Sequence, residues 1–251
     1  YAYVLKNNNS IEELPGYREG LFAVQDVSSM LAIELAGIKK GDVVGILSHN
    51  IPEFPISLFA IWYLGGTVLL LDTNLTPFEY ENMTATTKCK MVCAEKSFFF
   101  KTDKFTFYDI TKKDGKINPD LKPAAVESLD YATLSFTSGS TGKPKVVPLT
   151  HFNMVECTNS LESMAEWIRP GDFLYGFLPM YHVFGFGVEI LATLHFGAGV
   201  LLQPTVNPKE IMADFKKFRP QIIPAVPRLW EVFRNKIIDN VKAQKKWWLV
   251  S

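Results

Sequence analysis

Short, wholly apolar runs separated by helix-forming segments are the feature that most constrains the fold of this chain. Val43 to Leu47 (VVGIL) and Thr67 to Leu71 (TVLLL) carry no charge, and Lys90 to Ala94 is a third candidate strand. Between the first two, a helix is predicted from Pro52 to about Leu64, with Asn50 as its N-cap. Buried strands that alternate with helices predict an α/β fold, with mostly parallel sheets and helices on both faces.

The same pattern returns in the second half of the chain after a less regular stretch. Asp103 to Asp130 is predicted to be a surface connection with one edge strand at Phe105 to Tyr108. The other elements predicted are helices at Gln25–Leu35, from Thr76-Pro77 onward, from Thr150 to Ile168, at Pro208–Phe218 and from Pro227 to about Gln244, and strands at Tyr131–Phe136, Val146–Leu149 and Ile222–Val226. We therefore divide the chain into a first α/β subdomain with its connection, residues 1–130, and a second α/β subdomain, residues 131–251.

Two helices of the second half are expected to bury an apolar face. In the helix from Thr150 that face holds Phe152, Val155, Leu161, Met164, Ala165 and Ile168, and in the last helix it holds Leu229, Val232, Phe233 and Ile237.

Composition excludes several classes of partner. The 251 residues are 47% hydrophobic, which is ample for a buried core, and Lys+Arg and Asp+Glu number 26 each. This balance gives no electrostatic reason to expect a nucleic-acid partner. Cys89, Cys93 and Cys157 fit free thiols of a reducing compartment better than disulfides, and no metal site is predicted because no second ligand pair lies at a zinc spacing.

Two apolar stretches raise the question of a membrane span. Gly65-Gly66 interrupts Phe54 to Leu71, and Tyr175 to Leu202 contains one proline and five glycines, so neither is predicted to form one continuous apolar helix. Tyr1-Ala2-Tyr3 opens the chain without the basic and apolar segments of a signal peptide. We expect a cytoplasmic protein; peripheral membrane association and the oligomeric state are left open.

The loop Thr137 to Lys145, reading TSGSTGKPK, carries the strongest functional signal. Glycines allow the backbone to come close to a ligand, hydroxyls add neutral donors and lysines add positive charge, which is the combination that a polyphosphate requires. The residues predicted to bind the phosphates are Thr137, Ser138, Gly139, Ser140, Thr141, Gly142, Lys143 and Lys145.

Two other interpretations of this loop are weaker. A Walker A loop needs glycine where Thr137 stands and Ser or Thr where Pro144 stands, and it leads into a helix rather than into the strand predicted at Val146 to Leu149. A solvated Ser/Gly linker would not explain two lysines and a proline placed between two apolar strands.

The wider segment Leu134 to His151, LSFTSGSTGKPKVVPLTH, closely resembles the signature of the superfamily of AMP-forming acyl-CoA synthetases, peptide-synthetase adenylation domains and luciferases. The resemblance implies ATP and Mg²⁺ as the nucleotide system and coenzyme A as a co-substrate, with Thr137 to Thr141 and Lys143 on the β- and γ-phosphates. Val146 departs from the family, which usually has glycine there. If the backbone at this position needs a positive φ, Val146 would reshape the exit of the loop.

Leu178 to Gly185, LPMYHVFG, is similar to the second core motif of that superfamily. The resemblance places His182 beside the acyl and adenylate pocket, as the one residue predicted to act at the reacting carboxylate. Taken alone, a histidine in an apolar run is more often a hydrogen-bonded core residue. Gly185 and Gly187 are expected to leave room for a ligand against the following helix, and His195 is interpreted as structural.

Pro224 to Phe233, PAVPRLWEVF, resembles long-chain fatty acyl-CoA synthetases more than relatives that activate acetate, aryl acids or amino acids. An ordinary helix start, with Pro227 in the first turn and Trp230 in the core, explains the same residues. The segment therefore bears on the subfamily and not on the chemistry.

Together these features predict an ATP-dependent acid–thiol ligase that converts a long-chain fatty acid to acyl-AMP and then to acyl-CoA. The motifs that the superfamily uses for adenine, ribose and its catalytic lysine do not occur in these 251 residues, so the isolated chain is expected to be an inactive fragment of the N-terminal domain. Two alternatives stay open: a non-catalytic module that binds nucleotide or acyl chains, and an adenylating enzyme for another carboxylate.

Overall fold

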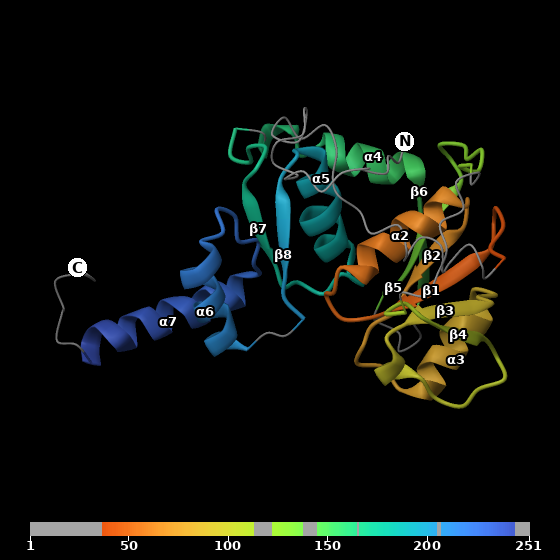
Figure 1. Cartoon of the computed structure of the whole chain (residues 1–251), viewed down its shortest axis with the longest axis horizontal. Coiled ribbons are helices and arrows are strands. Elements are labelled where there is room, and N and C mark those ends of the chain that lie inside the picture. Colours follow the sequence, from red (N-terminus) through yellow and green to blue (C-terminus); the bar gives the residue numbers. More distant parts are fainter. Residues whose placement is uncertain (1–36, 113–121, 138–144, 165, 205–206, 244–251) are drawn as a thin grey trace, which may run out of the picture.

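The computed structural model describes residues 37–112, 122–137, 145–164, 166–204 and 207–243 (Figure 1). In chain order the elements are β1 (Val43–Leu47), α2 (Glu53–Tyr63), β2 (Thr67–Leu70), α3 (Pro77–Thr86), β3 (Met91–Ala94), the 3-10 turn η2 (Lys96–Phe98), β4 (Thr106–Asp109), β5 (Tyr131–Thr137), β6 (Lys145–Thr150), α4 (His151–Asn159), the 3-10 turn η3 (Glu162–Met164), β7 (Phe173–Gly176), the π-helix η4 (Gly185–Ala192), α5 (Thr193–His195), β8 (Gly199–Leu202), α6 (Pro208–Phe218) and α7 (Pro227–Ala243). The helix predicted at Gln25–Leu35 lies outside the described residues.

Six strands form the larger sheet in the order β4-β3-β1-β2-β5-β6. The first five are parallel, and β6 runs antiparallel to β5 at the edge. Val43 lies opposite Thr67 and Val44 lies opposite Met91, so the three apolar runs predicted from the sequence are neighbours in the centre of the sheet. The α/β fold with a mostly parallel sheet is confirmed, and the predicted edge strand is β4, one residue later than expected.

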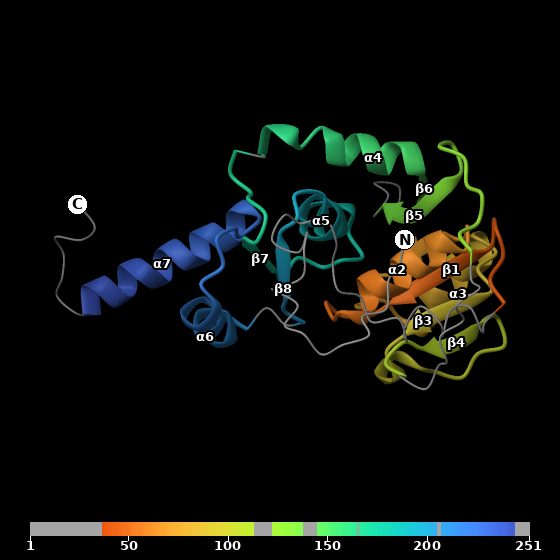
Figure 2. The same ribbon diagram turned by 45° about the horizontal axis from the view of Figure 1, so that its top comes forward.

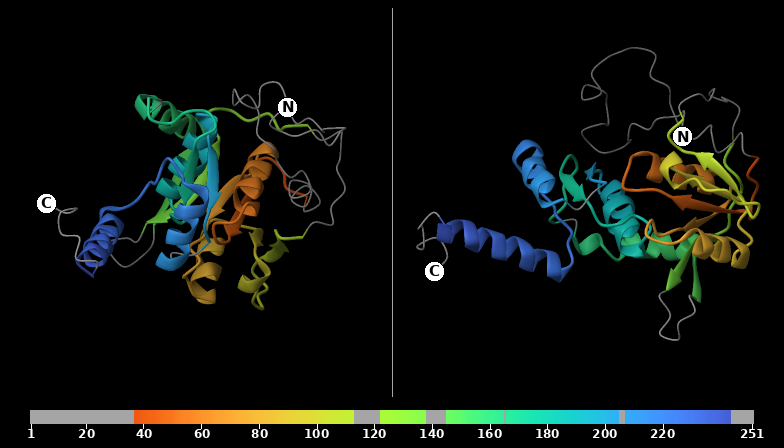
Figure 3. Two further views of the ribbon diagram at one scale, coloured as in Figure 1. Left: turned by 60° about the vertical axis from the view of Figure 1, so that its left-hand side comes forward. Right: turned by 90° about the horizontal axis from the view of Figure 1, so that it is seen from below.

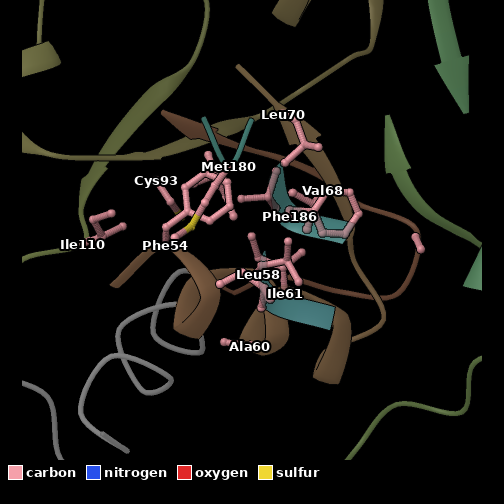
Figure 4. Packing of buried hydrophobic residues seen from close by; sticks show 14 of the residues in the cluster. Phe54, Leu58, Ala60, Ile61, Val68, Leu70, Cys93, Ile110, Met180 and Phe186 are labelled. Atoms are coloured by element: carbon pink, nitrogen blue, oxygen red, sulfur yellow. The ribbon is translucent and has the colours of Figure 1, made fainter. Parts of the chain in front are cut away.

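Alternate side chains of the central strands enter two different cores, one on each face of the sheet. Val44, Val68 and Leu70 join a cluster with Phe54 and Leu58 of α2 (Figure 4). On the opposite face, the residues between them pack with α3; this cluster contains Leu47, Leu69, Leu71, Tyr80, Val92 and Leu134. Each fully buried side chain of this size stabilises the fold by roughly 1.5–3 kcal/mol, which explains why these strands tolerate no charge. The helices lie on both faces, as predicted.

Asn50 does not cap α2, which corrects the prediction. The helix begins at Glu53, one residue later than predicted, with Pro52 in the N-cap position and no side-chain cap. Asn50 is only 6% exposed and its amide bonds to backbone far along the chain, as described below. By contrast, Thr76 and Thr150 cap α3 and α4 with a capping box each, as their sequences suggested.

The helix predicted from Thr150 to Ile168 is shorter than expected and buries a different face. It ends at Asn159, and the predicted inward residues Phe152 and Val155 are half exposed, whereas Met154 is buried. The reason is its position: α4 packs against η4 and the β5–β6 hairpin along the side of the helix that carries Met154.

A second, parallel pair of strands, β7 and β8, lies beside the larger sheet. η4 and α5 connect the two strands, and α6 and α7 lie on the side of β7–β8 that faces away from the six-stranded sheet (Figure 2). A third core around Tyr175, Phe177 and Ile211 joins β7 to α6, and Phe233 of α7 packs against it. Trp230 and Val232 of α7 are partly exposed, so the prediction that they face inward is wrong.

The strand predicted at Ile222–Val226 is reduced to one bridge between Leu174 and Ile222. Pro224 follows two residues later and has no N–H to extend a ladder, which explains why pairing stops. Within the described part of the chain, no helix has the length and apolar character needed to cross a bilayer. The division of the chain at residue 130 stays a prediction; β5 and β6 share one sheet with β1–β4.

Candidate functional site

The two ends of the predicted phosphate loop are held against each other. Thr137 is the last residue of β5 and Lys145 the first of β6, and the two are direct partners in the antiparallel ladder. Both are exposed, and the free end of the β5–β6 hairpin projects beyond the other four strands (Figure 3). The predicted ligands Ser138, Gly139, Ser140, Thr141, Gly142 and Lys143 lie outside the described residues. The loop leads into a strand, which excludes a Walker A arrangement.

Val146 fits this hairpin without strain. It lies opposite Phe136 and packs against the core that contains Leu134. Among the described residues other than glycine, only Lys88 and Arg219 have a positive φ, so the backbone at Val146 does not require glycine. The positive φ on which a reshaped loop exit depended is therefore absent at Val146.

Val146→Gly is expected to lower the free energy of unfolding by about 1–2 kcal/mol, because glycine in a strand loses both the packing and the backbone restriction of valine. Urea unfolding measures this loss. The control is Val147→Gly on the opposite, more exposed face of β6, which shares the backbone cost and should lose less. Equal losses would show that Val146 does not contribute to the core.

The turn that carries His182 connects β7 to η4. His182 is exposed, and its ring centre lies 4.6 Å from that of Tyr181. Its backbone N–H donates a hydrogen bond to the carbonyl of Pro179 at 3.0 Å. Its own carbonyl accepts from Phe186 N at 3.1 Å, which starts the helical segment. Met180 is fully buried beneath the turn. The imidazole is thus presented to solvent from a firmly anchored backbone.

Asn50, at the carboxyl end of β1, binds this turn across the molecule. Its Nδ2 donates to the carbonyl of Leu178 at 2.7 Å, and Met180 N donates to its Oδ1 at 3.2 Å. Sequence reasoning missed this role because the partners are about 130 residues away. An asparagine three residues after a strand predicted to be buried was the available signal.

The ends of β2 and β1 bring further polar groups to the same edge of the larger sheet. Asn74, just after β2, donates through Nδ2 to the hydroxyl of Tyr181 at 3.2 Å. Burial, followed by the nearby charge of Asp72, raises the pKa of Tyr181. At the ends of β1 and β3, His49 Nδ1 lies 2.9 Å from Glu95 Oε1. Ligands bind at carboxyl ends of parallel strands, so this edge is the expected place for one.

Gly185 and Gly187 differ in the space around them. A Cβ on Gly185 would lie 2.2 Å from the carbonyl oxygen of Pro179, so this glycine allows the turn and η4 to touch. A Cβ on the buried Gly187 would meet no atom within 4 Å outside the backbone of its own helix. The expectation of room for a ligand is therefore wrong at Gly185 and stays a prediction at Gly187.

The sequence profile of the AMP-binding enzyme family matches residues 16–247 of this chain. The chain belongs to the AMP-binding enzyme family. This family is the superfamily of adenylate-forming enzymes that the motifs at Thr137 to Lys145 and Leu178 to Gly185 resemble.

Two curated relatives and one solved structure illustrate the range within this family. Over 264 residues the chain is 25% identical to 4-coumarate–CoA ligase CCL1 of Humulus lupulus, covering 90% of this chain and 47% of that protein. Over 132 residues it is 30% identical to long-chain-fatty-acid–CoA ligase 1 of Schizosaccharomyces pombe, covering 51% and 20%. The fold matches o-succinylbenzoate CoA synthetase of Bacillus subtilis, solved with its acyl-adenylate intermediate, with a TM-score of 0.73, 22% identity and coverage of 83% and 56%.

The chain spans about half the length of the first curated relatives that it matches. Of the predicted site residues, the structure brings Thr137 and Lys145 together at the hairpin and places His182 on the separate turn after β7. No group of three or more His, Cys, Asp or Glu side chains in the described ranges is arranged to hold a metal ion.

Proposed function

We propose that the protein carrying this sequence activates a carboxylic acid with MgATP and then transfers the acyl group to coenzyme A. In the first step a carboxylate oxygen attacks the α-phosphorus, the bond to the β-phosphate breaks, and pyrophosphate leaves. In the second the thiol sulfur attacks the acyl carbon, its proton goes to solvent, and AMP leaves. The observation that carries the proposal is membership of the AMP-binding family together with TSGSTGKPK placed between two paired strands.

The residues of this chain would act mainly by positioning and by charge stabilisation. Thr137 to Thr141 and Lys143 would donate to the β- and γ-phosphates, with Lys145 at the exit of the loop. His182 would shape the carboxylate site from the turn. Mg²⁺ would arrive with ATP as part of the substrate and lower the negative charge that the attacking carboxylate meets; we assign it no protein ligand in this chain.

A long-chain fatty acid is the substrate that we propose. The Val-Pro-Arg-x-Trp-Glu segment and the similarity to a long-chain-fatty-acid–CoA ligase support it, and the open space at Gly187 would suit an apolar chain. The similarity to a 4-coumarate–CoA ligase, which extends over more of this chain, favours an aryl acid as the second candidate. Membrane contact would follow from a long-chain substrate and is not otherwise supported.

Substrate-dependent exchange of pyrophosphate into ATP tests the activity and the substrate class together. The natural protein is assayed with acetate, octanoate, palmitate, 4-coumarate and an amino acid, with a reaction lacking carboxylate as control. We expect exchange to be greatest with palmitate. Preference for 4-coumarate would replace the long-chain assignment by the aryl one. If none of the tested carboxylates supports exchange, the protein would instead be a module that binds nucleotide or acyl chains without turnover.

The isolated 251-residue chain is expected to support no exchange, because it lacks the family's motifs for adenine, ribose and the catalytic lysine. The same assay, run on the isolated chain at the concentration used for the natural protein, measures its rate of pyrophosphate exchange. Exchange above the level of the protein-free control would refute this part of the proposal.

A further inference from the structure

Glu189 is the most buried charged side chain in the described part of the chain. It lies on η4 with an exposed fraction of 0%. Its Oε1 accepts hydrogen bonds from Phe177 N at 3.1 Å and from Leu178 N at 2.9 Å. These two N–H groups follow directly after β7, where sheet pairing ends, and would otherwise be buried without partners. Glu189 therefore anchors the start of the turn that ends in His182, as Asn50 anchors its middle.

The second carboxyl oxygen has a different environment. Glu189 Oε2 is buried and has no hydrogen-bond partner among the described residues. A Cβ built on Gly176 would lie 3.2 Å from it and 2.7 Å from Val200 Cγ1, so a glycine in β7 leaves the space that the carboxyl occupies. A neutral glutamine could also accept from both N–H groups. A carboxyl with one unpaired oxygen is a costly way to secure a turn if structure alone is the purpose.

We propose that Glu189 is a positioning residue for the acyl-activation reaction, fixing His182 through the backbone of Phe177 and Leu178 and doing so most firmly when its carboxyl is ionised. The proposal rests on the proposed function for its effect on turnover. Its effect on the turn itself follows from the hydrogen bonds alone. Ionisation strengthens both bonds because a carboxylate is a better acceptor than a neutral carboxylic acid.

The surroundings of Glu189 place its titration near working pH. Burial raises the pKa of Glu189 from 4.5 to about 8, and the bonds from Leu178 and Phe177 pull it down without cancelling the effect. The titratable side chains on the elements around it are Tyr175 on β7, Tyr181 and His182 on the turn, His195 on α5, His151, Glu156 and Cys157 on α4, and Glu53 and Tyr63 on α2. None of them contributes to the shift, and Tyr175 instead donates to Asp214.

Two properties should then change with pH in opposite directions. Because folding raises the pKa of Glu189, its stabilising contribution is complete below about pH 4.5 and is lost as the pH rises through about 8. Over the same range the ionised fraction grows and the turn is held more firmly. A purely structural glutamate would change only the stability.

Glu189→Gln is the decisive variant, because its amide oxygen keeps the acceptor and its side chain does not titrate. We expect the stability of the natural protein relative to Glu189→Gln to fall between about pH 5 and about pH 9, while the ratio of their kcat values for pyrophosphate exchange rises. Glu189→Leu, which removes the acceptor, should lower kcat by about 10-fold or more with the KM for MgATP within about twofold. The exposed Glu162→Gln is the control and should change neither property.

A kcat ratio that stays constant across this pH range, with the stability difference changing, would overturn the positioning role. If Glu189→Leu does not fold, the comparison with Glu189→Gln still decides. If the natural protein activates no carboxylate, the proposed function fails but amide hydrogen exchange at Phe177 and Leu178 remains informative. Protection that increases with pH relative to Glu189→Gln supports the role of the carboxylate in the turn, and equal protection contradicts it.

Discussion

Gly185→Ala is expected to lower the free energy of unfolding by about 3 kcal/mol or more. The added methyl group would lie 2.2 Å from the carbonyl oxygen of Pro179 and 2.8 Å from its carbonyl carbon. Both atoms belong to backbone, so no side chain can rotate away. The turn also has little freedom to retreat, because Asn50 and Glu189 bind it on both sides. Urea unfolding of the variant and the parent protein measures the loss.

Gly187→Ala is the matched control on the same helix. Gly187 is also buried, but its Cβ would meet no atom within 4 Å outside its own helix backbone, and alanine favours a helix by about 1 kcal/mol over glycine. We therefore expect unchanged or slightly increased stability. Similar losses at Gly185 and Gly187 would contradict the close contact between η4 and Pro179.

Lys143→Ala is expected to lower kcat/KM for carboxylate-dependent pyrophosphate exchange by about 100-fold or more. An ammonium group on a polyphosphate forms charge-assisted hydrogen bonds, and preorganised donors of this kind typically contribute factors of about 10²–10³. The variant should fold normally, because its side chain is predicted to meet ligand and not core. Steady-state exchange kinetics at several MgATP concentrations measure the change.

Lys112→Ala provides the control for the loss of one positive charge. Lys112 is exposed and lies on the connection after β4, away from the predicted loop in sequence. Its exchange rate should equal that of the parent protein. An effect of Lys143→Ala smaller than about threefold would show that the loop at Thr137 to Lys145 is not the phosphate site.

The centre of the sheet was predictable because its strands are buried on both faces. Val43 to Leu47 and Thr67 to Leu71 contain no charged side chain that would need contact with water. The helix caps at Thr76 and Thr150 were predictable because each is a local pattern within a few consecutive residues. The inward face of α4 was not predictable from spacing. Phe152 and Val155 are apolar at helical spacing, but the packing of α4 on η4 selects Met154 instead.

The parts of the site that sequence reasoning missed depend on distant partners. Asn50 is a residue type that often caps helices, and it stands where a cap was expected. Only the fold shows that its side-chain amide is hydrogen-bonded to the backbone of Leu178 and Met180. Glu189 stood in the sequence as one acid in an apolar stretch, and its partners on Phe177 and Leu178 are separated from it by a turn and the first residues of η4. The phosphate loop, in contrast, is a contiguous motif, and its recognition needed no tertiary information.

Transfer of isotope from the carboxylate to AMP tests the central claim most directly. The natural protein is incubated with MgATP, coenzyme A and palmitate labelled with ¹⁸O in both carboxylate oxygens, and the nucleotide products are analysed by mass spectrometry. Adenylation predicts one ¹⁸O atom in AMP, none in pyrophosphate, and one retained in the thioester. Formation of ADP with ¹⁸O in the released phosphate, or of AMP without label, would contradict the proposed attack on the α-phosphorus.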